Sequence, residues 1–405
     1  MLDPGATITF LDLGVAPALV AALAKQGISA PTAIQEQALP VVQAGGDAYL
    51  NAETGTGKTL AYLLPIFGRL ALAPPASQAM IVAPTHELAI QIHRQCCDLA
   101  QNAGWLVRSL LLIGGTSMDR QLEKLKSKPH VVVGSPGRIH ELMSLGKLKA
   151  LGIRTLVIDE ADRLLAAEDL PVIRAIVQRL PGDRRLIFAS ATEQPECAAA
   201  IATLAPELVM LRAGASAMNA GTTHLYLVCE ERDKPRVLRQ LLHATRPERA
   251  LVFSHINAAA ERVAAQLAHH QVEAVALHGG IDKSRRKPSM EDFRSGRVRV
   301  MVASDIAARG LDIPCVTHVF NLDVPTQSKA YLHRVGRTGR AGAKGEAISL
   351  ITESEVRLVG RYERELGIVL RRVRLREGRV IAVDDAPRRA KARPDQRPRP
   401  ARKRV

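Results

Sequence analysis

Residues 52–59 read Ala52-Glu53-Thr54-Gly55-Thr56-Gly57-Lys58-Thr59 and directly follow a short apolar run at residues 48–51. They fit the phosphate-binding loop pattern, with Ala in place of its first Gly. The glycines let backbone N–H groups face phosphate oxygens, Lys58 can reach the β- and γ-phosphates, and the Thr59 hydroxyl can ligate Mg²⁺. The sequence therefore predicts a strand, a phosphate-binding loop and a helix, as in an α/β nucleotide-binding fold.

A second apolar run, at residues 155–158, ends in Asp159-Glu160-Ala161-Asp162. A nucleotide site also needs a carboxylate near the metal, and this run supplies one at the carboxyl end of a strand. Asp159 is expected to hold Mg²⁺, partly through water, and Glu160 to position and deprotonate the attacking water. An acidic turn after a core strand can also be merely solvated, but Lys58 upstream favours the catalytic interpretation.

Short apolar runs with helical stretches between them occur in two series. The first comprises residues 48–51, 80–83, 131–133, 155–158 and 186–189, and the second comprises residues 250–253, 273–277, 298–303, 317–321 and 347–351. Such runs are typical of parallel sheets covered by helices on both faces. Residues 212–221 between the series are small and lack periodicity, as expected of a linker. We therefore expect an N-terminal domain at residues 1–212, a linker at 213–221, a C-terminal domain at 222–379 and a tail at 380–405.

The chain has 405 residues, a net charge of +16 and a pI near 10, which favours a polyanionic partner. Residues 387–405 carry nine basic side chains and one acid, and so supply half of that charge. With four prolines and few large apolar residues, this tail is expected to be disordered. It could serve as a solubilising tail or as a non-specific nucleic-acid clamp.

Targeting and redox signals are few. The five cysteines include no Cys-x-x-Cys pair and read as reduced thiols, which fits a cytoplasmic protein. The N-terminus lacks the basic start of a signal peptide, and the uncharged residues 13–24 are too few to span a bilayer. We expect neither export nor a membrane span.

From about residue 10 to residue 342, the sequence resembles the DEAD-box family of RNA helicases, since residues 159–162 spell its name and further motifs follow in order. The resemblance implies two tandem RecA-like P-loop domains that use ATP and Mg²⁺. Gln35 resembles the family's adenine-reading residue, with Phe10 near the base and Asp312 at the ribose. The implied ATP site is completed by the loop residues Ala52, Glu53, Thr54, Gly55, Thr56, Gly57, Lys58 and Thr59.

Further motifs resemble the family's RNA-backbone contacts, which set affinity but carry no sequence information. In the first domain these residues are Pro84, Thr85, His86, Gly115, Ser135, Pro136, Gly137 and Arg138. In the second domain they are Arg286, Ser304, Asp305 and Arg309. The implied partner is therefore RNA, bound independently of its sequence by a core that we expect to be monomeric.

Two more motifs concern catalysis and coupling. Arg337 and Arg340 match the family's arginine fingers, which neutralise charge on the γ-phosphate in the transition state. The segment that links hydrolysis to strand separation is implied to comprise Asp162, Ser190, Ala191, Thr192 and His333.

The sequence departs from the family pattern at several positions. His86 stands where the family has Arg, so this phosphate contact depends on protonation. Ser135 and Ser304 replace Thr and keep the hydroxyl. Lys283 stands where Gln is usual, and Pro288 would cost about 3 kcal/mol inside a helix unless the helix starts later or bends.

Together these features predict an RNA-stimulated ATPase in which ATP and single-stranded RNA close the two domains and bend one strand, which opens a duplex locally. Two alternatives use the same fold. A DNA-directed helicase would differ in 2′-hydroxyl recognition. A non-catalytic RNA clamp or annealing protein would not turn over ATP.

Overall fold

The computed structural model describes residues 8–52, 55–166, 168–192, 195–212, 221–278, 280–281, 283–305, 316–339 and 344–383, apart from the side chains of residues 283, 284, 287 and 329. Several predicted features lie outside these residues. They are Glu53, Thr54, Arg309, Asp312, Arg340, residues 213–220 of the linker and residues 384–405 of the tail.

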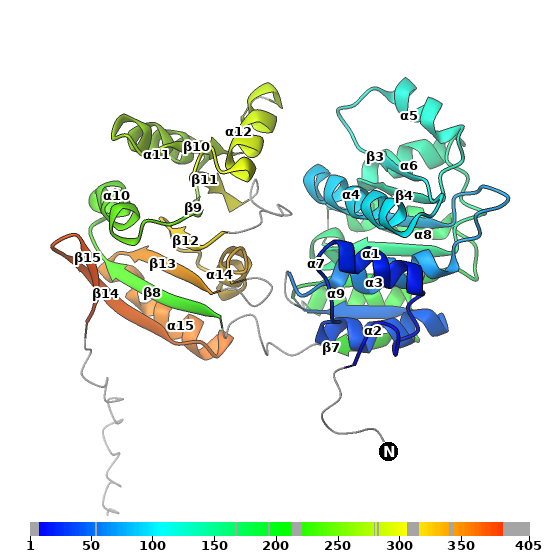
Figure 1. Cartoon of the computed structure of the whole chain (residues 1–405), viewed down its shortest axis with the longest axis horizontal. Helices are drawn as coiled ribbons and strands as arrows, with labels where there is room; N and C mark the ends of the chain where they lie inside the picture. Colours follow the sequence, from blue (N-terminus) through cyan, green and yellow to red (C-terminus); the bar gives the residue numbers. More distant parts are fainter. Residues whose placement is uncertain are drawn as a thin grey trace, which may run out of the picture.

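The first domain is built on a seven-stranded sheet in the order β3-β4-β2-β5-β6-β1-β7, with every neighbouring pair parallel. Its helices cover both faces (Figure 1). The strands are β1 Ala48–Asn51, β2 Ala79–Val82, β3 Ser109–Leu112, β4 Val131–Gly134, β5 Thr155–Asp159, β6 Arg185–Ser190 and β7 Val209–Arg212. The helices are α1 Pro17–Lys25, α2 Ala33–Ala44, α3 Lys58–Arg69, α4 His86–Ala103, α5 Met118–Leu125, α6 Pro136–Ser144, α7 Ala161–Leu164, α8 Leu170–Gln178 and α9 Pro195–Leu204.

The second domain is built on an eight-stranded sheet in the order β10-β11-β9-β12-β13-β8-β14-β15, parallel except for the terminal β14–β15 hairpin. The strands are β8 Thr222–Val228, β9 Ala250–Ser254, β10 Ala274–Leu277, β11 Val300–Ser304, β12 His318–Asn321, β13 Gly345–Ile351, β14 Leu370–Arg376 and β15 Arg379–Ala382. The helices are α10 Lys234–Thr245, α11 Asn257–His269, α12 Lys283–Ser295, α14 Ser328–Val335 and α15 Val356–Leu366.

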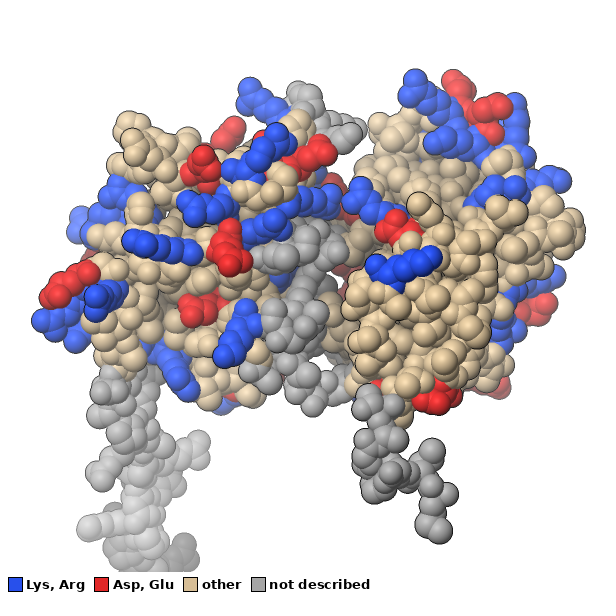
Figure 2. All heavy atoms as spheres, in the orientation of Figure 1, with Lys and Arg blue, Asp and Glu red and all other residues tan. Residues whose placement is uncertain are grey.

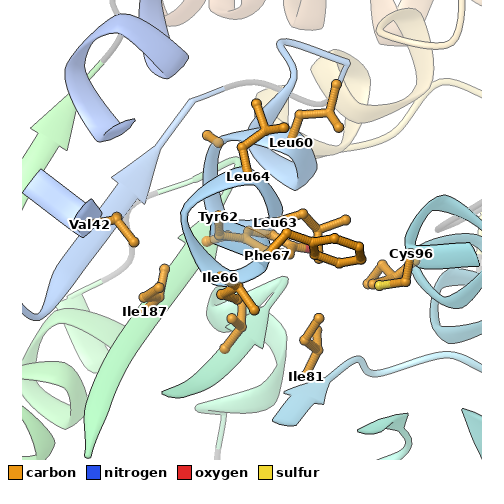
Figure 3. Packing of buried hydrophobic residues seen from close by; sticks show 14 of the residues in the cluster. Val42, Leu60, Tyr62, Leu63, Leu64, Ile66, Phe67, Ile81, Cys96 and Ile187 are labelled. Atoms are coloured by element: carbon orange, nitrogen blue, oxygen red, sulfur yellow. The ribbon is translucent and has the colours of Figure 1, made fainter. Parts of the chain in front are cut away.

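Alternate residues of each central strand enter different cores. In β2, Ile81 packs in the cluster with α3, whereas Met80 packs in the cluster with α6 and α8 on the other face. Figure 3 shows Tyr62, Leu63 and Phe67 of α3 within the first of these clusters. Strands buried on both faces read as continuous apolar runs, and so the expected two-domain parallel architecture is confirmed.

Each apolar run predicted above lies in a strand whose ends differ from the prediction by at most two residues. The prediction missed β3, β7, β8, β14 and β15. It also ended the second domain at residue 379, which was wrong because β15 continues to Ala382. Glu377 and Gly378 have φ values of 52° and 73°, the left-handed backbone of a two-residue hairpin turn.

Helix α12 neither starts after Pro288 nor ends before it. The proline lies inside the helix, as Pro40 does in α2 and Pro65 does in α3. Of the two possibilities that the sequence left open, a later start and a bend, the later start does not occur, and the backbone accepts the loss of one hydrogen bond at the proline.

None of the helices described here is long and apolar enough to cross a membrane.

Candidate active site

The phosphate-binding loop joins β1 to α3. Gly55 and Gly57 have φ values of 87° and 91°, a conformation that disfavours side chains. A Cβ at Gly57 would also lie 2.4 Å from Gln35 Nε2. Helix α3 begins at Lys58, whose ammonium donates to the carbonyl of Ala52 across the loop. The loop therefore has the shape of a phosphate cradle, with a lysine held inside it.

Helix α2 fixes this loop from one side. Gln35 donates from Nε2 to Gly57 O at 3.0 Å and accepts from Thr32 N–H at 2.9 Å. Thr32 Oγ1 donates to Thr56 O at 2.7 Å. Gln35 thus lies beside the loop, as expected, although its side chain is only 1% exposed. Phe10 is likewise 1% exposed and packs in the adjoining core, so the contacts of both residues with adenine stay predictions.

Asp159 ends β5 within reach of the loop. Its Oδ2 accepts from Tyr62 Oη at 2.8 Å, and its Oδ1 accepts from Glu160 N–H at 2.9 Å. Burial raises the pKa of Asp159, and the nearby charge of Lys58 opposes that shift. Burial also raises the pKa of Tyr62, so the phenol stays protonated and remains a donor.

Glu160 adopts the left-handed conformation, with φ 50° and ψ 52°, at the start of α7. This backbone is strained for a residue other than glycine and is typical of functional sites. Burial and the charge of Asp159 raise the pKa of Glu160, whereas Arg337 lowers it. Since Arg337 belongs to the second domain, the two domains meet electrostatically at this carboxylate.

Of the predicted coupling residues, those of the first domain lie together. Thr192 Oγ1 donates to a carboxylate oxygen of Asp162. Ser190 Oγ donates to Thr192 O at 2.7 Å, and Tyr49 Oη donates to the same carbonyl at 3.1 Å. Ala191 lies between the two hydroxyl residues. In the second domain, Arg337 Nε donates to His333 O at 3.3 Å.

The predicted RNA residues of the first domain lie at helix starts and glycine turns. Thr85 caps α4 by accepting from Leu88 N–H at 3.2 Å, and His86 is the first residue of that helix. Ser135 and Pro136 begin α6, where a Cβ at Gly137 would meet nothing within 4 Å. Such partly exposed helix N-termini suit phosphate oxygens.

Two other predicted RNA residues of the first domain, Gly115 and Arg138, do not lie at a helix start in the same way. Gly115 has φ 70°, and a Cβ at the preceding Gly114 would lie 3.6 Å from His86 Nε2. Arg138 forms an ion pair with Glu141 at 3.0 Å, and its side chain is 13% exposed. Direct contact between Arg138 and a phosphate would require this pair to open.

Arg286 of α12 forms an ion pair with Glu87 of α4, with 2.6 Å between Nη2 and Oε1. The pair joins the two domains next to His86 and Thr85. Arg286 is thus adjacent to the predicted RNA residues at the start of α4, on the side where α12 faces α4 (Figure 1).

Asp305 forms an ion pair with an arginine of the same domain. Its two carboxylate oxygens accept from Arg334 at 2.5 and 2.6 Å, and Arg334 is 1% exposed. A carboxylate held in this way orients the arginine and would repel a phosphate. Both carboxylate oxygens of Asp305 are therefore engaged by Arg334, and its RNA contact stays a prediction. Ser304, at the end of β11, is only 2% exposed, so its RNA contact stays a prediction.

Sequence reasoning missed Tyr62, Glu87 and Arg334. Glu87 directly follows Pro84, Thr85 and His86, which were predicted to contact RNA, but no role was predicted for Glu87 itself. Tyr62 follows Lys58 by one helical turn, so the two residues lie on the same face of α3. This spacing, which puts the Tyr62 hydroxyl on the side of the helix that faces the site, was the available signal.

Comparison with known proteins fits this geometry. A model of the DEAD/DEAH box helicase family matches residues 32–200, and a model of the helicase conserved C-terminal domain matches residues 233–342. The DEAD-box ATP-dependent RNA helicase CshC of Bacillus cereus is 36% identical over 90% of this chain and 93% of its own length. The probable ATP-dependent RNA helicase YfmL of Bacillus subtilis is 39% identical over 85% of this chain and 91% of its own length.

Among solved structures, S. cerevisiae Dbp5 bound to RNA and ADP BeF3 matches with a TM-score of 0.82 and 29% identity, and the match covers 90% of this chain and 95% of Dbp5. Both RecA-like domains are included in that match. The chain therefore belongs to the DEAD-box family of ATP-dependent RNA helicases.

Proposed function

We propose that RNA stimulates this helicase to hydrolyse ATP, and that closure of its two domains opens RNA duplexes locally and remodels RNA–protein complexes. The observation that carries the proposal is the position of Arg337, a second-domain residue whose charge acts on Glu160 in the first domain. An active site divided in this way works only when the domains are closed, which makes ATP turnover dependent on whatever closes them.

The proposed catalytic roles follow from chemistry and position. Lys58 and the backbone N–H groups of the loop bind the β- and γ-phosphates. Glu160 orients and deprotonates water, while Arg337 and Arg340 stabilise the charge that develops on the transferred phosphoryl group. Thr192, bonded to Asp162, transmits the state of this site towards the second domain.

The residues fit Mg²⁺ as well. Thr59 offers a hydroxyl and Asp159 a carboxylate, the hard oxygen ligands that Mg²⁺ prefers in nucleotide sites. When bound, the ion would neutralise phosphate charge. Held by Tyr62 and by its neighbour's N–H, Asp159 stays oriented towards the loop.

On the RNA side, we propose that backbone phosphates bridge the helix starts of the first domain and Arg286 of the second. Such contacts ignore sequence, so target choice depends on RNA shape or on partner proteins. We further propose a monomeric core in the cytoplasm, with domains at residues 1–212 and 222–382 joined by the linker at 213–221.

Glu160→Gln tests the catalytic assignment. This variant should bind ATP and RNA but lose at least about 1,000-fold in ATP turnover, because the carboxylate that activates water is gone. Because the variant cannot hydrolyse its ATP, it should stay closed on ATP and RNA, and RNA should be released slowly in the presence of ATP. If turnover survived, the catalytic assignment of Glu160 would be wrong.

The nature of the nucleic acid requires its own measurement. RNA and DNA strands of the same sequence should be compared as activators of ATP turnover by the wild type. We expect RNA to activate and DNA to activate weakly, since 2′-hydroxyl contacts distinguish the two. Equal activation would favour the DNA-directed alternative, and the absence of activation by either would favour the non-catalytic clamp.

A further inference from the structure

A hollow of about 450 Å³ lies on the first domain at the outer edge of β3. Strand β3 ends the sheet and pairs with β4 alone, so no strand among the described residues covers its other side. Helix α4 forms one wall of the hollow with His93, α5 forms the other with Arg120 and Lys124, and β3 forms the floor. In Figure 1, these three elements lie next to one another at one end of the first domain. The three side chains named here belong to neither the predicted ATP site nor the predicted RNA site.

The backbone of β3 directs alternate residues towards this edge. Arg108 O and Leu112 O accept from N–H groups of β4 and of the residue after it, at 3.2 and 3.0 Å, so the even-numbered residues bond towards β4. The odd-numbered residues between them therefore point the other way, as the outer groups of an edge strand do. Both Ser109 and Leu111 line the hollow. Their backbone N–H and C=O groups are thus available for pairing with a further strand.

Gln121 of α5 already takes the place of a neighbouring strand at one end of this edge. Its Nε2 donates to Ile113 O at 3.0 Å, the bond that the N–H of a paired strand would make. The side chain lines the hollow and is 5% exposed, yet its Oε1 has no hydrogen-bond partner among the groups that the structure describes. A buried acceptor is unfavourable unless a donor reaches it. An N–H group of a chain laid along β3 would be such a donor.

Helix α5 runs along the edge of β3. Gln121 bonds to the carboxyl end of the strand. Burial and then the charge of Lys124 lower the pKa of His93, whose Nδ1 lies 2.9 Å from Ser109 Oγ at the start of the strand. Arg120 and Lys124 are separated by roughly 6 Å along the helix axis, and alternate residues of a strand are roughly 6.6 Å apart. The two cations therefore match alternate side chains of an extended chain on β3.

The α5 wall of the hollow is positively charged. Both Arg120 and Lys124 are exposed, and neither forms an ion pair within the described part of the chain. The acids of the same helix do not line the hollow, and Glu123 pairs with Lys126 at 2.6 Å. Figure 2 shows Lys and Arg side chains gathered at this end of the first domain, with a few acids between them. Since the lowered pKa of His93 keeps the α4 wall neutral at pH 7, the charge of the hollow comes from α5.

Cations beside a free edge also protect it from pairing with other chains. In this domain they select the charge of the chain that can pair, because residues 109–112 of β3 have no charge of their own. A second copy of this protein would bring Arg120 and Lys124 against the same residues of its partner, and the repulsion disfavours that pairing. An acidic chain meets complementary charges instead. The edge therefore fits an acidic extended segment of another protein.

We propose that the outer edge of β3 binds an extended acidic segment of a partner protein, which joins the sheet as a further strand. Acidic side chains at alternate positions of that segment contact Arg120 and Lys124, and the side chains between them face His93 and Ser109. The backbone ladder supplies affinity, and the cations supply specificity. This docking site is separate from the ATP and RNA sites and connects the helicase to a protein partner.

A synthetic peptide that alternates Asp and Thr is the probe, and fluorescence anisotropy measures its binding to the full chain. Arg120→Gln combined with Lys124→Gln should weaken binding about fivefold, because two partly exposed ion pairs are lost. Lys147→Gln combined with Lys149→Gln is the matched control, since it removes two exposed cations elsewhere in the first domain, and it should bind as the wild type does. Equal losses in both double variants, or equal binding of a peptide with Asn in place of Asp, would overturn the proposal.

Backbone methylation of the peptide tests the pairing itself. One peptide is N-methylated at every Asp and another at every Thr. Alternate N–H groups of a strand point to opposite sides, so only one of the two peptides should lose binding. In the wild type, the unmethylated peptide should slow hydrogen exchange of the Leu111 amide, which faces the edge, and leave that of Leu110, which faces β4, unchanged. Equal effects of the two methylations, or unchanged exchange at Leu111, would show that charge alone holds the peptide and would exclude strand addition.

Discussion

Tyr62 shows how one side chain outside the recognised motifs can orient a carboxylate of the proposed Mg²⁺ site. It lies one turn after Lys58 and donates to Asp159, so a single helix holds both the lysine and the partner of the carboxylate. Hydrogen bonds to charged groups contribute about 1.5–3 kcal/mol. Loss of this bond should therefore be measurable in metal binding.

Tyr62→Phe is expected to raise the Mg²⁺ concentration that half-saturates ATP turnover by about tenfold or more. The ring still fills the core, but Asp159 loses its donor and with it a fixed orientation. A Mg²⁺ titration of RNA-stimulated turnover measures the change. Tyr49→Phe is the control, since it removes an equally buried hydroxyl that serves Thr192 instead, and its Mg²⁺ dependence should match the wild type. An unchanged Mg²⁺ requirement in Tyr62→Phe would show that Asp159 is held without the phenol.

Residues whose role depends on local sequence could be predicted from it. Gly57 and Lys58 are specified by their spacing within one strand–loop–helix unit, and Asp159 by its place at the end of an apolar strand. The partners of Asp305 could not be predicted, because Arg334 is distant in sequence and reaches it only after the second sheet has formed. That pairing fixes the orientation of Asp305, whose RNA contact stays a prediction.

At the scale of elements, β8 carries a buried histidine that makes the second domain sensitive to acid. His224 is 5% exposed, lies 2.9 Å from Tyr331 Oη, and has its pKa lowered by burial from 6.5 to about 4. The folded state therefore binds this proton less readily than the unfolded state does. Its contribution to stability is complete above pH 6.5 and is lost as the pH falls from 6.5 towards 4.

Lowering the pH from 7.5 to 4 should reduce the local free energy of unfolding around β8 by on the order of 3 kcal/mol. His224→Gln keeps a polar side chain but cannot gain this charge, so the loss should largely disappear. Hydrogen exchange of the β8 and β13 amides, corrected for the intrinsic rate, measures local stability. His269→Gln, at an exposed position of α11, is the control and should retain the wild-type pH dependence.

Strands that are buried on both faces were predictable, because a short apolar run between turn signals is typical of a fully buried strand. The β14–β15 hairpin was not. Its sequence, Leu370-Arg371-Arg372-Val373-Arg374-Leu375-Arg376, alternates apolar and basic side chains irregularly, as expected at an exposed sheet edge. Its turn signal, Glu377-Gly378, is also weaker than the Asn-Gly or Asp-Gly pairs that mark such hairpins.

At the scale of the whole molecule, local sequence predicts two domains but not how they face each other. That arrangement depends on contacts between residues about two hundred positions apart, such as Glu87 and Arg286. The pair lies where the predicted RNA surfaces of the two domains adjoin. We therefore expect the pair to couple domain closure to RNA binding by two routes: Glu87 attracts Arg286 directly, and Arg286 is proposed to contact a phosphate.

Charge reversal separates these two routes. Both side chains are partly exposed, at 22% and 31%, so the pair should contribute roughly 0.5–1 kcal/mol, or about two- to fivefold in the RNA concentration that half-saturates ATP turnover. Glu87→Ala should raise that concentration by this factor. Arg286→Glu should raise it further, because it places two carboxylates together and removes a phosphate contact.

The double variant Glu87→Arg with Arg286→Glu restores an attractive pair in the opposite sense and moves the cation to α4. If Arg286 only holds the domains together, the double variant should recover wild-type RNA dependence. If Arg286 also binds phosphate at its own position, recovery should be partial, and the coupling energy from the four-variant cycle should be smaller than the effect of Arg286→Glu alone. We expect the partial result, because Arg286 lies beside the helix starts that phosphates approach. Full recovery would restrict Arg286 to domain closure.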